Sequence, residues 1–336
     1  KANQPGFLPY NDASLNVPPG SIIEKTFWLE AYPVPEEGAG FQRPVWTSLS
    51  LFDPYCTEGL PTFEEIVRAK YCFSDTRWHE TRDAAGYTKY PDKPILVMGW
   101  CGQAAALGFA NQVLGPRLGA PEALERAQKS LDFLTNAVFY EGGFHTWYHC
   151  NSNTWDHHEP LSQGQAMLSF ANAILAAPKS GLDDSAWRIF LGKACDFHAR
   201  RILKEDWNPT STDEGFFIAP LCAAHQIFGQ DEYLLAATKA AEVYAARSLS
   251  MREPYWGGTL DASCEDKEGA FAAFQGFLAL HEVTKEPQYL KWARHACDVA
   301  LTYVVVWDID LPPGRLRDHA FKTRGWTAVS VQNMHI

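Results

Sequence analysis

The sequence predicts a mainly α-helical protein whose helices form an α/α toroid, a ring of inner helices wrapped by outer helices. Long Ala-rich helical patterns follow one another from Pro94 to the end of the chain. These patterns alternate between helices that are apolar nearly all round and helices with charges on one face, as inner and outer layers require. They also repeat at a regular interval, and the 336 residues suffice for one large ring.

The elements are predicted in chain order from periodicity and from Gly and Pro punctuation. Residues 20–52 alternate β-rich runs with Pro and Gly, which predicts strands or extended segments. We therefore expect an extended, β-rich N-terminal segment over 1–62 that packs on a toroid catalytic domain over 63–336. Helices are predicted near 63–76, 94–115, 121–140, 160–178, 184–204, 216–228, 231–248, 265–285 and 287–305, with a tenth starting near Thr327.

The repeat is clearest between two of the predicted outer helices. Residues 231–244 and 287–300 share Tyr, Leu and two Ala at a constant offset of 56 residues. The predicted inner helices also share a Gly-Gln-Ala sequence near their starts, at 102–104 and 164–166. Five inner-helix starts are visible at a spacing near sixty residues, so we expect a ring that is incomplete at its C-terminal end.

Composition excludes several classes of function. Apolar residues make up 46% of the chain and no apolar run approaches the length that spans a bilayer, so no membrane partner is expected. The net charge of −11 without a Lys/Arg cluster argues against nucleic acid as a partner. The eight cysteines are scattered singly without a CxxC pair, which favours small buried residues over a metal framework.

The predicted connections are unequal in length at the two ends of the ring. Loops that enter inner helices are long and rich in aromatic and acidic residues, at 141–159, 205–215, 250–264 and 306–326. Connections at the opposite end are as short as Gly229-Gln230. The first long loop leads into FHTWYHCNSNTWDHHEPLSQGQA over 144–166, which gathers four His, two Trp and two acids. This asymmetry predicts a single ligand site at one end of the ring.

Two segments carry a resemblance to a known superfamily. EGGFHTW followed by QGQA, and the later WGGTLDASCEDKEGAFAAFQGF, resemble the six-hairpin glycosidase superfamily and its relatives, which include unsaturated uronyl hydrolases and uronyl epimerases. The resemblance extends from Pro94 onward and implies a carbohydrate-active enzyme with paired carboxylates in its cavity. A sugar polymer as substrate favours a secreted or periplasmic location, and the oligomeric state stays open.

Glycosidic hydrolysis needs one carboxylic acid and one carboxylate, and the loops offer both. Asp156 and Asp261 stand well ahead of their helices and are the expected catalytic pair, with Glu265 as a further candidate. Aromatic faces stack on sugar rings, while His, Gln and Arg bind hydroxyl or carboxylate groups. The expected substrate contacts are His145, Trp147, Tyr148, His149, Trp155, His158, Gln165, Tyr255, Trp256 and Arg324.

Other roles remain open for some of these residues. Ser211-x-x-Glu214 has a capping-box spacing, so Glu214, Asp266 and Glu268 are interpreted mainly as helix caps or solvated acids. The loop around His149 reads as extended, which favours substrate contact over a metal site, and no metal or other cofactor is expected. A glycoside hydrolase is the leading hypothesis. A polysaccharide lyase or uronyl epimerase that uses Tyr148 and His149 is the alternative, and a non-catalytic sugar-binding scaffold is the third.

Overall fold

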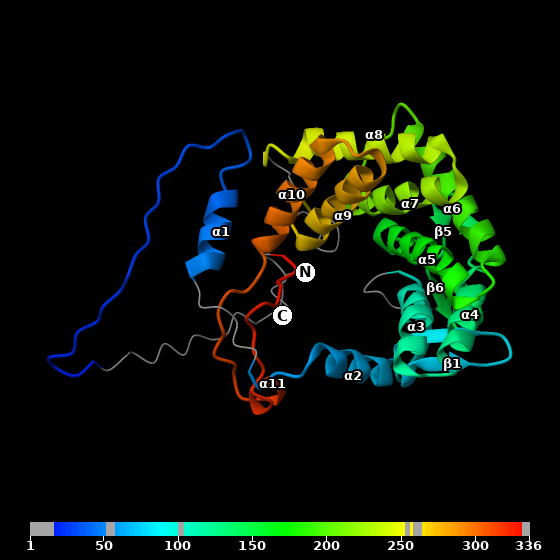
Figure 1. Ribbon diagram of the computed structural model, residues 1–336, viewed down its shortest axis with the longest axis horizontal. Helices are drawn as coiled ribbons and strands as arrows, with labels where there is room; N and C mark the ends of the chain where they lie inside the picture. The colour runs from blue at the N-terminus through cyan, green and yellow to red at the C-terminus, as the bar shows by residue number, and fades with distance from the viewer. Residues whose placement is uncertain (1–16, 52–57, 100–103, 253–255, 258–263, 331–336) are drawn as a thin grey trace.

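Helical hairpins arranged around a ring dominate the computed structural model (Figure 1). The structure describes residues 17–51, 58–99, 104–252, 256–257 and 264–330. Four inner helices face the centre of the ring: α3 (Ala104–Leu118), α5 (Pro160–Ser180), α7 (Ile218–Phe228) and α9 (Lys267–Thr284). Their outer partners are α4 (Ala123–Leu134), α6 (Ser185–Leu203), α8 (Asp231–Ser248) and α10 (Pro287–Leu301). The predicted alternation of inner and outer helices is confirmed.

Small residues allow the layers of the ring to approach closely. Ala166, Ala173, Ala236 and Ala240 are almost fully buried, and they lie where neighbouring helices meet. A Cβ atom on Gly164 of α5 would collide with the backbone of Phe216, so only glycine permits this contact between consecutive hairpins. Close packing of Ala-rich helices explains why the inner class reads as apolar on every side.

A five-stranded antiparallel sheet packs against the first hairpin, in the order β1-β2-β3-β6-β7. Its strands are β1 (Trp78–Glu80), β2 (Ala85–Tyr90), β3 (Lys93–Val97), β6 (Trp147–His149) and β7 (Thr154–Asp156). A separate short hairpin pairs β4 (Phe139–Tyr140) with β5 (Gly143–Phe144). The first long loop thus contains three short strands, in agreement with the extended conformation expected around His149, and β6 pairs with β3 from the segment before the ring.

Three predictions of secondary structure are wrong. The strands expected between 20 and 52 are absent from the described residues 17–51, where Gln42–Leu51 instead forms α1. Side chains of Gln42 and Trp46 donate to the buried carboxylate of Asp298 on α10, a tertiary contact that holds α1 against the ring. Residues 94–97 belong to β3 rather than to a helix. Thr327 pairs with Val304 in an isolated bridge, so no helix starts there among the described residues.

The remaining elements are short or peripheral. Helix α2 (Phe63–Asp75) begins with a capping box between Thr62 and Glu65. A 3-10 turn η1 (Asp213–Phe217) leads directly into α7, and α11 (Arg315–Asp318) lies in the last long loop. None of the helices in the described part of the chain is long and apolar enough to cross a membrane.

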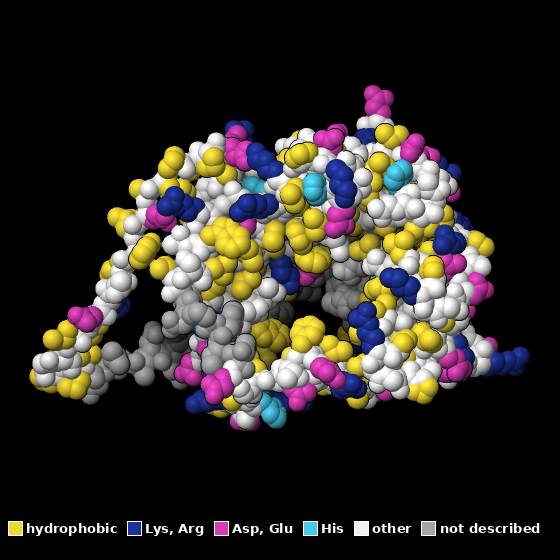
Figure 2. Space-filling view, viewed as in Figure 1, with side chains coloured by type: hydrophobic (Ala, Val, Ile, Leu, Met, Phe, Trp, Pro, Cys, Tyr) yellow, Lys and Arg dark blue, Asp and Glu magenta, His cyan; other side chains and the backbone are white. Residues whose placement is uncertain are grey.

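The loops that enter the inner helices meet at one end of the ring, as predicted. The loop before α7 donates from the Thr212 N–H to the Gly257 carbonyl in the next loop, at 3.1 Å. Asp266, at the end of the loop before α9, in turn forms an isolated β-bridge with Ser330, which follows the last long loop. The last three of these loops therefore contact one another through their backbones. Figure 2 shows this molecule hollowed at the centre of the ring.

Candidate functional site

The start of α5 organises the candidate site through one buried amide, that of Gln163. Its Oε1 accepts from the Phe144 N–H at 3.1 Å, and its Nε2 donates to the carbonyls of Gly142 and His158 at 3.2 and 2.9 Å. Gly143 has φ +116°, and a Cβ there would lie 2.1 Å from Gln163 Oε1. The sequence folds this way because only glycine lets the β4–β5 turn approach the amide so closely.

A chain of polar groups extends from Gln163 into the ring. His198 of α6 is fully buried, and its Nε2 lies 3.0 Å from Gln163 Oε1. Because an amide oxygen can only accept, His198 carries its proton on Nε2 and presents the lone pair of Nδ1 to Arg201, whose Nη2 lies 3.5 Å away. Burial, followed by the Arg201 charge, holds the pKa of His198 well below its usual value. His198 is therefore neutral and acts as a positioning group.

Arg201 and Glu214 form an ion pair that ties α6 to the loop before α7. The guanidinium meets both carboxylate oxygens, at 3.0 and 2.9 Å, and the indole of Trp207 donates to the same carboxylate at 2.9 Å. The predicted capping role of Glu214 is wrong, because its carboxylate is committed to these two partners and the cap residue Thr212 makes no side-chain cap bond. Asp266 does cap α9, by accepting from the Gly269 N–H at 2.8 Å.

Next to this network, four side chains gather at the N-terminal end of α5 and are candidates for contact with a ligand: Tyr140, His145, His158 and Glu159. The Tyr140 ring stacks on His145 at 4.6 Å and lies 5.0 Å from His158, and the two imidazole centroids are 6.3 Å apart. The Tyr140 hydroxyl is buried without a hydrogen-bond partner. Burial and the nearby Glu159 charge raise the pKa of Tyr140, while Arg201 opposes them. Orphaned polar groups of this kind are typical of sites that await a ligand.

His145 is held in the tautomer of a proton acceptor. Its Nδ1 lies 3.1 Å from the carbonyl of His157, which can only accept, so Nδ1 carries the hydrogen. In the neutral ring, Nε2 then holds the lone pair. His158 and Glu159 are exposed beside it, and Glu159 makes only a long contact of 3.4 Å with Thr146 Oγ1. We call Tyr140, His145, His158 and Glu159 the α5 cluster.

The two faces of β6 separate the residues that the sequence grouped together. Tyr148 and Trp155 pair across β6 and β7, and both rings contact Phe133 of α4, at 4.8 and 6.0 Å. Tyr148 is 5% exposed, and Trp256 in a later loop is fully buried. The expected substrate contacts by Tyr148 and Trp256 are therefore contradicted, because these rings fill the core and present no face to a sugar. Trp155 is half-buried in the same aromatic stack.

The opposite face of β6 and β7 carries a second cluster, made of His149, Asp156 and His157. One carboxylate oxygen of Asp156 accepts from His149 Nε2 at 2.9 Å and from His157 Nδ1 at 2.6 Å. Partial burial raises the pKa of Asp156, but the bonds from His157 and His149 outweigh it, so the pKa lies below its usual value. Trp147 is not an open platform, because the His157 ring stacks on it at 4.3 Å and Lys89 Nζ lies 4.4 Å from its centroid.

The other predicted site residues are dispersed. Asp261 and Tyr255 lie outside the described residues. Glu265 is half-buried and pairs through its backbone with Gly257, and the backbone N–H of Arg324 donates to Asp308 at 3.2 Å. Gln165 lies one position past Gly164 on α5, and its Oε1 is buried without a partner. Gln165 lies on α5, the helix that begins directly after His158 and Glu159.

One further acid stands out, Asp213 at the start of η1. Burial, opposed by a bond from Ser211 and reinforced by the Glu214 charge, raises the pKa of Asp213. The side chain of Asp213 is only half-buried. A carboxyl group with a raised pKa is what general-acid chemistry requires.

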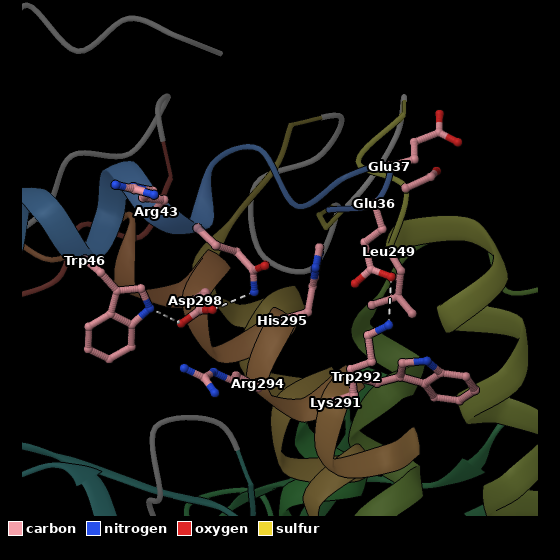
Figure 3. Close-up of a pocket in the computed structure, with 12 residues that line it drawn as sticks. Glu36, Glu37, Arg43, Trp46, Leu249, Lys291, Trp292, Arg294, His295 and Asp298 are labelled. Atoms are coloured by element: carbon pink, nitrogen blue, oxygen red, sulfur yellow. Dashed lines mark hydrogen bonds and ion pairs between the residues drawn. The ribbon is translucent and has the colours of Figure 1, made fainter. Parts of the chain in front are cut away.

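A pocket of about 430 Å³ lies on the outer side of the ring, between α1 and α10 (Figure 3). Gln42, Trp46 and Asp298 line one wall, and Lys291 pairs with Glu36 on another. None of the predicted site residues that the structure describes lines it. It results from the packing of α1 against an outer helix, and it is separate from the α5 cluster.

Sequence reasoning missed several residues that build the site. Gln163, His198 and Arg201 were assigned no role, although Gln163 lies within the QGQA segment that drew attention to Gln165. Tyr140 was missed because it precedes the turn. Gly142-Gly143 could have indicated the site, since two consecutive glycines between aromatic residues mark a place where the backbone approaches another group closely.

Comparisons with known proteins bear on the fold. No family model matches the sequence, and no curated protein matches it. Among solved structures, cellobiose 2-epimerase from Spirochaeta thermophila has a TM-score of 0.54 at 16% identity, covering 89% of this chain and 79% of that chain. Cellobiose 2-epimerase from Bacillus thermoamylovorans has a TM-score of 0.53 at 11% identity, covering 89% and 82%. A D-mannose isomerase has a TM-score of 0.52 at 13% identity, covering 76% of this chain and 74% of that chain. These likenesses bear on the fold alone, and they agree with the α/α-toroid arrangement of the helices.

Proposed function

We propose that the protein is a carbohydrate-active enzyme that epimerises or isomerises a reducing sugar by proton transfer in the α5 cluster. The observation that carries this proposal is the tautomer of His145. Its Nδ1 is tied to the His157 carbonyl, so Nε2 holds the lone pair, and the ring centroid of His158 lies 6.3 Å from that of His145. One carbon atom of a substrate can lie between two imidazoles at this separation and exchange a proton with each of them.

The chemistry requires a base that removes a proton from the carbon next to a carbonyl group, and an acid that returns one. Imidazole suits both steps, because its usual pKa near 6.5 makes it a competent acceptor and donor at neutral pH. The negative charge that develops on the sugar oxygen would be stabilised by the positive end of the α5 dipole and by the Tyr140 hydroxyl, which has no hydrogen-bond partner. The fold shared with two cellobiose 2-epimerases and a D-mannose isomerase supports this class of substrate.

Proton exchange in D₂O tests the proposal. The protein is incubated with cellobiose, mannose, glucose or a reducing uronate disaccharide, and NMR follows deuterium at the carbon next to the carbonyl together with the new epimer or ketose. His145→Gln and His158→Gln should each lower the exchange rate at least about 100-fold, the usual contribution of a general base or acid.

His225→Gln is the matched control. His225 also binds a backbone carbonyl through Nδ1, that of Gln230 at 3.0 Å, but it lies in the last turn of α7, at the opposite end of the inner helices. It should retain the wild-type rate. Retention of more than a tenth of the rate in both His145 and His158 variants would refute the assignment.

Asp213 favours a second candidate, a glycoside hydrolase. Its raised pKa suits the acid that protonates a leaving oxygen, and Glu159 or Asp261 would supply the second carboxylate. New reducing ends without deuterium incorporation would support this function. The lyase that pairs Tyr148 with His149 is disfavoured because adjacent residues of β6 point to opposite faces. Unsaturated uronate absorbance would reveal it, and binding without turnover would indicate a scaffold.

A further inference from the structure

The second cluster, on the solvent face of β6 and β7, has the composition of a metal site. The ligand atoms of His149, Asp156 and His157 all lie within 4.8 Å of one another. Two imidazole nitrogens and one carboxylate oxygen are the donors that divalent transition cations such as Zn²⁺ prefer. We propose that these three side chains bind one Zn²⁺-class cation, which keeps at least one coordination position for water.

The geometry requires only small side-chain movements. In a tetrahedral site, ligand atoms about 2.0–2.1 Å from zinc lie about 3.3 Å from each other. The two imidazole nitrogens now lie 2.9 and 2.6 Å from Asp156 Oδ1, so each separation must open by less than about 1 Å. The cation replaces the two hydrogens that now bridge the imidazoles to the carboxylate. Each neutral imidazole then carries its hydrogen on its other ring nitrogen, Nδ1 of His149 and Nε2 of His157, through exchange with solvent and without net proton loss.

The backbone presents the three ligands from rigid positions. His149 and Asp156 come from adjacent antiparallel strands, on the same face of the sheet. His157 follows directly with φ +57°, a left-handed conformation that is uncommon outside glycine and that turns its ring back toward Asp156. Strained backbone of this kind persists where the surroundings enforce it, and functional sites are enriched in it.

The surroundings hold His157 in place and keep the site accessible. The Trp147 indole stacks on the His157 ring with an interplanar angle of 17°, which fixes the imidazole plane. The side chains remain 29%, 48% and 43% exposed for His149, Asp156 and His157, so a cation can enter from solvent. Lys89 over Trp147 adds one positive charge nearby, which weakens binding without blocking it.

The proposed site would also brace the α5 cluster. The carbonyl of His157 accepts the hydrogen bond that fixes the His145 tautomer, and His158 follows in sequence. A cation that joins His157 to β6 therefore restrains the carbonyl that orients His145 and the backbone that carries His158. The metal site itself does not depend on the proposed sugar chemistry.

Metal titration of the full chain tests the proposal without any enzyme assay. The chelator-treated protein is titrated with Zn²⁺ by calorimetry and with Co²⁺ by visible absorbance, and Trp147 fluorescence provides a third signal. We expect one equivalent to bind. His149→Gln and His157→Gln should each weaken binding at least about tenfold, since even the loss of an outer-shell partner costs this much.

His281→Gln is the control, because His281 binds the Glu286 carbonyl through Nδ1 at 3.0 Å on the far end of α9. It should bind the cation as the wild type does. Circular dichroism checks folding, and the exposed His157 gives a usable variant if His149→Gln does not fold. Absence of binding at about 1 mM Zn²⁺, or unchanged affinity in the folded variants, would overturn the proposal.

Discussion

Gln163 is the residue on which the arrangement of the candidate site most depends, and Gln163→Leu is therefore the most informative stability test. The side chain is 1% exposed and similar in volume to leucine. The substitution removes the acceptor for two buried donors, the Phe144 N–H and His198 Nε2–H. It also removes the donor to the carbonyls of Gly142 and His158.

The expected cost follows from the groups left behind. Each buried donor without an acceptor costs about 1–3 kcal/mol, while leucine adds some apolar burial, so the free energy of unfolding should fall by about 2–5 kcal/mol. An unfolding entropy of about 2.1 cal/mol/K per residue over this chain converts that loss into a decrease in Tm of about 3–7 °C. Urea unfolding followed by circular dichroism measures the first quantity, and a thermal scan measures the second.

Gln165→Leu provides the matched control two residues along the same helix. The Oε1 of Gln165 is already buried without a partner, so its replacement removes no hydrogen bond that the structure contains. It should change the free energy of unfolding by less than about 1 kcal/mol. If Gln163→Leu costs no more than Gln165→Leu, the reasoning about the buried amide is refuted.

Three further predictions concern the same network. Gly143→Ala should cost about 2 kcal/mol or more, measured by urea unfolding, because φ +116° and the Gln163 amide both exclude a Cβ; a smaller loss would mean that the turn relaxes. Glu214→Ala should cost about 3 kcal/mol by the same measurement, because Arg201 loses its paired carboxylate in a largely buried position, and a loss under about 1 kcal/mol would contradict the pair's importance. His198 stays neutral in the folded protein because burial lowers its pKa, whereas in the unfolded chain it takes up a proton below about pH 6.5. The free energy of unfolding of the wild type should therefore decrease by up to about 1.4 kcal/mol for each pH unit below that value. His198→Gln should show a shallower slope, and identical slopes would contradict the assignment.

The residues of the α5 cluster show how far local sequence reasoning reaches. His145 and His158 were selected because a loop rich in imidazole and aromatic groups precedes an inner helix, and that residue-type argument needs no coordinates. Which of the four histidines of the loop belong together was not predictable, because it depends on strand register. The pairing of Trp147 with Asp156 across β6 and β7 directs His149 to one face and Tyr148 to the other.

The sequence by itself determined the ring. Helix periodicity, the alternation of apolar and charged faces and the lengths of the loops are local properties, and each is readable within a few turns of helix. The tertiary structure alone decided the helix at 42–51, because its side chains bind Asp298, more than 250 residues away in sequence. It also decided the network that joins Gln163 to His198, 35 residues further along the chain. Side-chain hydrogen bonds between distant segments leave no periodic trace in a sequence, because their geometry exists only after the helices have packed together.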